Sequence, residues 1–177
     1  IPEERMHDGV IQDFSIAENI ILQDHIRRPY SKGIFLDFKA IAKRSQQLVD
    51  DFRVKTPSID TPIKSLSGGN IQKVILAREI SNAPKVLIAA QPTRGVDIGA
   101  TEYIHQRLIE QRDLGTAILL ISEDLDEILA LSDRIAVLYE GQIMGVVDRK
   151  DTNAQELGLM MAGVRQEQLA EAVAATN

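Results

Sequence analysis

The amino-acid sequence predicts an α/β fold in which a helical first half is followed by a mainly parallel sheet flanked by helices. Short apolar runs at 85–90, 116–121 and 134–139 have the length of buried strands. Helical patterns at 99–114 and 124–131 separate these runs. Strands that alternate with helices imply parallel pairing in a layered domain.

The first half contains start signals for three helices, expected at 15–24, 37–52 and 67–81. Ser15 and Glu18 have the spacing of a capping box, and Asp37 is a suitable N-cap for the second helix. These signals predict a helical region that precedes the first strand.

After the third strand the pattern changes from crossovers to a hairpin. Glu140-Gly141-Gln142 predicts a tight turn into a strand at 143–147, and Thr152 to Gln155 predicts the start of a last helix. Residues after Gly163 read as a helical or frayed tail. The organisation we expect is 1–84, 85–148 and 149–177.

Composition excludes several classes of function. The formal net charge is −6, which argues against a nucleic-acid groove, and no cysteine is available for disulfides, thiolate zinc sites or nucleophilic catalysis. No segment approaches the ~20 apolar residues of a membrane span. The three histidines show no ligand spacing, so we expect no metal site. The chain starts at Ile1 without Met, which predicts that the natural N-terminus is missing.

One segment carries a chemical signal. Leu66-Ser67-Gly68-Gly69-Asn70 stands directly before a helical pattern. Ser67 offers a hydroxyl at the N-cap, the two glycines let an oxyanion approach the backbone amides, and the helix dipole favours negative charge there. This pattern indicates a phosphate-binding tip, although an ordinary serine-capped helix fits the five residues equally well.

Five segments in order resemble motifs of ATP-binding-cassette (ABC) ATPases. Residues 66–78 resemble the signature motif and its helix. Residues 86–100, with Pro92-Thr93-Arg94-Gly95, resemble the Walker B strand and D-loop. Residues 118–127 resemble the switch strand and H-loop, 132–143 the strands that follow, and 1–5 the Q-loop region of importers of simple sugars and nucleosides.

The resemblance implies a partial P-loop ABC domain that lacks the Walker A strand and loop, with 1–84 as the helical subdomain. It implies the second nucleotide-binding half of a longer, two-cassette subunit that uses ATP and Mg²⁺. In such proteins the signature of one cassette closes over ATP held by the other. The implied nucleotide contacts here are Ser67, Gly68, Gly69 and Asn70 in trans, Asp97 in the D-loop, and Glu3 at the Q-loop position.

The sequence departs from the family where catalysis takes place. The Walker B acids that serve Mg²⁺ and the attacking water are replaced by Ala90 and Gln91, and the H-loop histidine by Glu123. Alanine has no ligand oxygen, and glutamine cannot accept a proton at neutral pH. We therefore expect this half's own site to be inactive, and the chain alone to bind ATP weakly at best.

Three functional hypotheses follow. The first is the ATP-binding subunit of a sugar or nucleoside importer, peripheral at the cytoplasmic face of the membrane, with permease subunits and the other nucleotide-binding half as partners. The second is a non-catalytic half that couples closure to the membrane subunits. The third, an ABC protein of translation or DNA repair, would need a basic surface, and we expect no nucleic-acid partner.

Without the phosphate-loop strand, the isolated chain should have a gap in its sheet. By the family's strand order the missing strand would lie between 116–121 and 134–139. Its absence is expected to expose two strand edges, which either pair directly or promote self-association.

Overall fold

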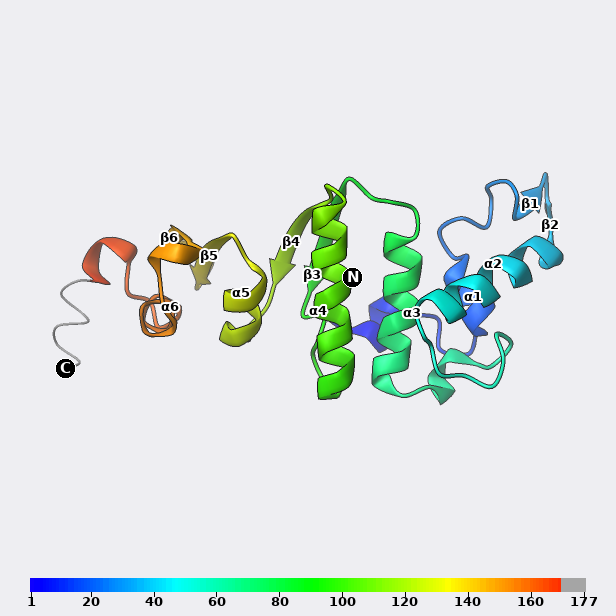
Figure 1. The fold of residues 1–177 in the computed structure, drawn as a ribbon, viewed down its shortest axis with the longest axis horizontal. Helices are drawn as coiled ribbons and strands as arrows, with labels where there is room; N and C mark the ends of the chain where they lie inside the picture. Colours follow the sequence, from blue (N-terminus) through cyan, green and yellow to red (C-terminus); the bar gives the residue numbers. More distant parts are fainter. Residues whose placement is uncertain (170–177) are drawn as a thin grey trace. The chain divides into compact units, whose positions relative to one another are not determined.

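The computed structural model describes residues 1–169 and has an α/β fold (Figure 1). Its contacts divide the chain into two compact units, Ile1–Ile121 and a second that begins at Ser122. The organisation 1–84, 85–148 and 149–177 expected from the sequence stays a prediction.

The first unit contains most of the helices. Its elements are the π-helix η1 (Arg5–Gly9), α1 (Ile16–Ile20), the hairpin β1 (Ser31–Lys32) and β2 (Phe35–Leu36), α2 (Phe38–Asp51), the 3₁₀ turn η2 (Ile63–Ser65), α3 (Gly68–Ile80), β3 (Val86–Ala90), α4 (Ile98–Asp113) and β4 (Ala117–Ile121). Helix α3 contacts α1 and α2 as well as α4 (Figure 1). It is therefore the central helix of this unit.

Two of the three helix starts predicted in the first half are confirmed by their caps. The Ser15 hydroxyl accepts from the Glu18 amide at 3.2 Å, and the Ser15 amide donates to the Glu18 carboxylate at 2.7 Å. The Asp37 carboxylate accepts from the Ala40 amide at 3.0 Å. Helix α1 is shorter than the expected range of 15–24, because the α-helix ends at Ile20 with Ile21 as its C-cap. The short β1–β2 hairpin was not predicted.

Strands β3 and β4 form the expected parallel pair, in register from Val86 opposite Ala117 to Ala90 opposite Ile121. The expectation of a fully buried strand at 85–90 is wrong. Leu87 and Ala89 are buried, but Val86 is 64% and Ile88 is 54% exposed. One face of this two-stranded sheet thus remains open in the described part of the chain.

The second unit contains α5 (Leu125–Leu131), β5 (Arg134–Tyr139), β6 (Gln142–Asp148), the 3₁₀ turn η3 (Arg149–Asp151), α6 (Ala154–Met161) and the 3₁₀ turn η4 (Gln166–Gln168). Strands β5 and β6 are antiparallel and joined by the predicted turn, where Glu140 and Gly141 have positive φ. The side chain that caps α6 is Asn153 rather than Thr152, since it accepts from the Glu156 amide. The end of the predicted tail, 170–177, lies outside the described residues.

A core of five apolar residues holds the second unit together: Ile135, Val137, Met144, Leu157 and Met160. Among the described residues, β4 pairs with β3 and β5 pairs with β6. In the same residues, no helix has the length and apolar character that crossing a membrane requires.

Candidate functional site

The predicted tip, Ser67 to Asn70, lies at the start of α3. Ser67 is the N-cap residue with extended backbone (φ −65°, ψ 155°) and is exposed. Its hydroxyl caps no helix amide, contrary to the simplest expectation; it accepts instead from the Asn70 side-chain amide at 2.9 Å. Because the first amides of a helix have no intrahelical partner, those at the start of α3 can receive an anion.

Asn70 holds the neighbouring loop against the tip. Its side-chain oxygen accepts from the Lys55 backbone amide at 2.8 Å, while its nitrogen donates to Ser67. Asn70 thus orients the Ser67 hydroxyl, and its side chain is occupied at both ends. The structure therefore gives Asn70 a positioning role within the tip.

The two glycines of the tip are packed closely against the loop before α4. A Cβ on Gly69 would lie 2.9 Å from the Cβ of Ala100 and 3.4 Å from a carboxylate oxygen of Asp97. Asp97 also caps α4, accepting from the Ala100 amide at 2.9 Å. The structure therefore brings together Gly69 and Asp97, two of the residues that the sequence singled out.

Two arginines complete this region, and sequence reasoning missed both. Arg5 donates to the backbone oxygens of Arg94 and, at 3.0 Å, of Gly95. Arg94 forms ion pairs with Glu3 and, at 3.4 Å, with Glu4. No spacing rule links residues about 90 positions apart, so only the fold could reveal them. Together with Met6 and Gly95, these four side chains line a pocket of about 220 Å³.

Positive charge lies close to the tip in this acidic chain. Burial, followed by the charge of Lys55, lowers the pKa of Lys73, and Arg53 acts in the same direction. The Lys73 ammonium donates to the Arg53 backbone oxygen at 3.2 Å and lies 4.7 Å from the centre of the Tyr103 ring. The Lys55 backbone amide is bonded to Asn70, so residues that carry positive charge belong to the segment next to the tip.

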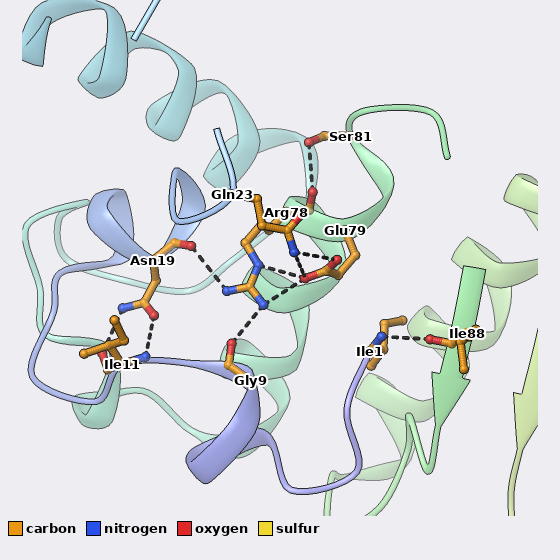
Figure 2. A network of polar contacts seen from close by, with 9 residues as sticks. All are labelled: Ile1, Gly9, Ile11, Asn19, Gln23, Arg78, Glu79, Ser81 and Ile88. Carbon is orange, nitrogen blue, oxygen red and sulfur yellow. Dashed lines mark hydrogen bonds and ion pairs between the residues drawn. The ribbon is translucent and has the colours of Figure 1, made fainter. Parts of the chain in front are cut away.

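The end of β3 carries no acid. Ala90 is its last residue, with its amide bonded to the Ile1 backbone oxygen at 3.0 Å, and Gln91 follows in the left-handed region (φ 47°). The Ile1 ammonium donates to the Ile88 oxygen at 2.8 Å (Figure 2). Ala90 has no side-chain oxygen and Gln91 has only a neutral amide oxygen, so the end of β3 offers no carboxylate to a Mg²⁺ ion. No group of three His, Cys, Asp or Glu in residues 1–169 could hold a metal ion.

Glu123 lies in the second unit, where it is exposed before α5. Asp124 caps that helix, since its carboxylate accepts from the Asp126 and Glu127 amides at 2.9 and 3.3 Å. The acidic run from Glu123 to Glu127 therefore lies at a helix start, and Glu127 within it is buried.

A buried polar network anchors the other end of α3 (Figure 2). Arg78 is 6% exposed and donates to the backbone oxygens of Gly9 at 2.9 Å and Asn19 at 3.4 Å. It also pairs with Glu79 at 2.8 Å. Asn19 is fully buried and exchanges two hydrogen bonds with the backbone of Ile11. The helix that carries the tip is thereby fixed to segment 9–19.

Segment 8–20 presents two large apolar side chains at the surface. Ile11 and Phe14 are 42% and 41% exposed, whereas Val10 is buried. No lysine or arginine occurs between residues 8 and 20, so this surface has no basic stripe.

Three known proteins that are similar to the chain in sequence are all named as import ATP-binding proteins. The chain is 49% identical over 172 residues to the guanosine import ATP-binding protein NupO of Bacillus subtilis, and 50% identical over 163 residues to the nucleoside import ATP-binding protein NupA of Lactococcus lactis. It is 42% identical to the ribose import ATP-binding protein RbsA of Streptococcus agalactiae. These matches cover 97%, 92% and 92% of the chain but only 34%, 32% and 33% of the relatives, so the chain spans about a third of their length. No protein-family model matches the sequence.

Solved structures share the fold. The dimeric post-hydrolysis state of the ATP-binding cassette MJ0796, bound to ADP and Pi, has a TM-score of 0.64 at 23% identity and covers 80% of this chain and 59% of that one. The ADP conformation of the cassette MJ1267 has a TM-score of 0.61 at 21% identity, with 90% and 63% covered.

Proposed function

Because the chain belongs to the ATP-binding proteins of ABC transporters, we propose that its tip, Ser67 to Asn70, acts in trans on ATP held by a second cassette. The observation that carries the proposal is the helix start of α3, which combines unpaired amides, an exposed hydroxyl and two glycines. In the full-length protein the Ser67 hydroxyl and the glycine amides contact the γ-phosphate as charge shifts during transfer.

The chain's own cassette half is inactive under this proposal. Ala90 and Gln91 end β3 without a carboxylate, and an anionic Glu123 replaces the residue that senses phosphate. ATP and Mg²⁺ are therefore cofactors of the full-length protein, and this chain alone binds neither tightly. Asp97 supports the tip from the D-loop, next to Gly69. Glu3 remains the residue assigned to the Q-loop position.

The substrates in the relatives' names support import of a nucleoside or a simple sugar. Identity reaches 49–50% with the guanosine and nucleoside importers and 40–42% with the glucose and ribose importers. We therefore propose a nucleoside as the transported solute, ahead of a simple sugar.

The partners we propose are the other nucleotide-binding half of the same subunit and membrane permease subunits. Exposed Ile11 and Phe14 suit apolar docking to a permease, and the absence of a basic stripe there argues against nucleic acid. Under this proposal the protein is peripheral at the cytoplasmic face of the membrane.

The test is steady-state ATPase and solute uptake of the full-length protein with its permease. Ser67→Ala removes one donor and should lower the rate roughly a hundredfold. Gly69→Asp should lower it further, because it places a carboxylate against the phosphate. Glu123→His should change little, since Ala90 and Gln91 still disable that site. Restoration of activity by Glu123→His in a protein inactivated at Ser67 would show that the two sites are assigned wrongly.

A second candidate is a non-catalytic half that only couples closure to the membrane subunits. The replaced residues Ala90, Gln91 and Glu123 favour it. It predicts that Ser67→Ala leaves ATPase activity unchanged while uptake falls. The same assay therefore separates the two functions.

A further inference from the structure

We propose that Arg5 and Arg94 are positioning residues for the tip. With Glu3 and Glu4 they form an arginine clamp that holds loop 94–97 against the start of α3. The proposal rests on the proposed function of the tip and adds two residues that act on it through the backbone.

The first half of the clamp is Arg5. Its guanidinium donates to two successive backbone oxygens, those of Arg94 and Gly95. Gly95 has φ +64°, a left-handed conformation that favours glycine. A Cβ on Gly95 would lie 3.2 Å from the Arg5 Nη2 atom, so Gly95 also provides the space in which the guanidinium lies.

The second half of the clamp is Arg94, whose side chain extends from the loop back to segment 3–5. Arg94 reaches back to the carboxylates of Glu3 and Glu4, next to Arg5. Segment 3–5 therefore binds the loop backbone through an arginine, and the loop binds segment 3–5 through another. The hydrogen bonds from Arg5 and the ion pairs of Arg94 therefore hold loop 94–97 against segment 3–5 from both sides. Together they restrict movement of the loop along that segment more than either set does alone.

The clamp touches the tip directly. A Cβ on Gly68 would lie 2.9 Å from the Arg5 Nη2 atom and 3.4 Å from the Gly95 oxygen. Two residues after Gly95, Asp97 caps α4 and lies beside Gly69. Fixing the backbone at Gly95 thus fixes the wall against which both glycines of the tip are packed.

The geometry requires a guanidinium rather than a positive charge alone. Arg94, Glu3 and Glu4 have side chains that are 57%, 47% and 65% exposed, so their ion pairs contribute little by themselves. Arg5 is half-buried, and its planar fork can hold two acceptors at once, which a lysine ammonium cannot do in the same fixed geometry. The clamp therefore depends mainly on Arg5.

The experiment measures ATPase kinetics of the full-length protein with Arg5→Ala, Arg5→Lys and Arg94→Ala, and with Arg28→Ala as an exposed arginine control. Loss of charged hydrogen bonds predicts about a tenfold lower kcat for Arg5→Ala, with KM for ATP within about twofold because the other cassette holds the nucleotide. Arg5→Lys should recover less than half of the lost rate, Arg94→Ala should lower kcat about threefold, and Arg28→Ala should match the wild type.

Amide hydrogen exchange supplies a readout that is independent of catalysis. In Arg5→Ala the amides of Gly95, Val96 and Asp97 should exchange about tenfold faster, because the loop loses its two charged donors. Full activity of Arg5→Lys, or unchanged exchange at these amides in Arg5→Ala, overturns the clamp. Since lysine keeps the charge, Arg5→Lys and Arg94→Ala remain informative if Arg5→Ala fails to fold.

Ser67→Ala, at an exposed position, separates the two proposals in the same assay. If Ser67→Ala lowers ATPase and Arg5→Ala does not affect it, the clamp is wrong and the tip stands. If Ser67→Ala also leaves ATPase unchanged, the proposed function itself is wrong.

Discussion

At the scale of single residues, the packing of the tip requires a glycine at position 69, because there is no room for a Cβ there. Gly69 is buried where α3 and α4 begin, and its missing Cβ allows Asp97 and Ala100 to approach. This close packing makes the position intolerant of any side chain. Substitution should therefore affect stability as well as binding.

Gly69→Ala should lower the free energy of unfolding by about 1–3 kcal/mol, because a methyl group 2.9 Å from the Ala100 Cβ forces two helix starts apart. The matched control is Gly158→Ala in α6, where a Cβ meets no atom within 4 Å. In a helix interior this change should raise stability by about 0.5–1 kcal/mol. Chemical denaturation measures both, and a neutral Gly69→Ala would contradict the close packing.

At the scale of elements, α1 depends on a charged cap. Hydrogen bonds from the Ser15 backbone and hydroxyl lower the pKa of Glu18 below its ordinary value of 4.5. Since the folded pKa is the lower one, this cap contributes fully above about pH 4.5 and is lost as the pH falls through the folded pKa. Glu18→Gln can still form a capping box, so its stability should vary less with pH in this range. An NMR titration that finds an ordinary pKa for Glu18 would contradict this.

Helix α3 depends on its buried anchor. Arg78→Ala should lower the free energy of unfolding by about 3 kcal/mol or more, because Glu79 and two backbone oxygens lose a buried partner. Arg28→Ala, at an exposed position, should change it by less than about 0.5 kcal/mol. Equal effects in thermal or chemical unfolding would show that the network in Figure 2 does not stabilise the fold.

At the scale of the whole molecule, the 177-residue chain should neither bind Mg-ATP tightly nor hydrolyse it. Its sequence contains no phosphate loop with lysine, and Ala90 offers no oxygen to a metal. Isothermal calorimetry is the direct measurement. Micromolar binding, or turnover above a buffer blank, would reveal a nucleotide site that neither the tip nor the end of β3 accounts for.

The same chain should self-associate. Strands β3 and β4 form a two-stranded sheet, and Leu119 and Ile121 in β4 are 54% and 49% exposed. Unpaired edges and apolar faces promote pairing with another chain. Analytical ultracentrifugation should show that the average molecular mass rises with protein concentration. Leu119→Lys should reduce this self-association, because a lysine on an edge strand opposes pairing. A monomer at all concentrations would contradict this expectation.

Much of the site could be predicted because its signals are local. The helix start at Asp37 follows from a side chain that bonds an amide three residues ahead, and the glycines of the tip are adjacent in sequence. The order of motifs from Ile1 to 143 indicated the family and the fold. Boundaries were less certain, as the early end of α1 and the cap at Asn153 show.

The sequence by itself therefore predicted most of the helices and strands, the caps at Ser15 and Asp37 and the position of the tip, and it has no acid at positions 90 and 91. Tertiary structure decided what surrounds the tip, because Arg5 and Gly95 lie 90 positions apart and meet only after α3, β3 and α4 have packed. It also decided that Val86 and Ile88 are exposed, since burial depends on which layer covers a strand. Local bonding is encoded within a few residues, whereas contacts between distant segments exist only once the chain has closed on itself.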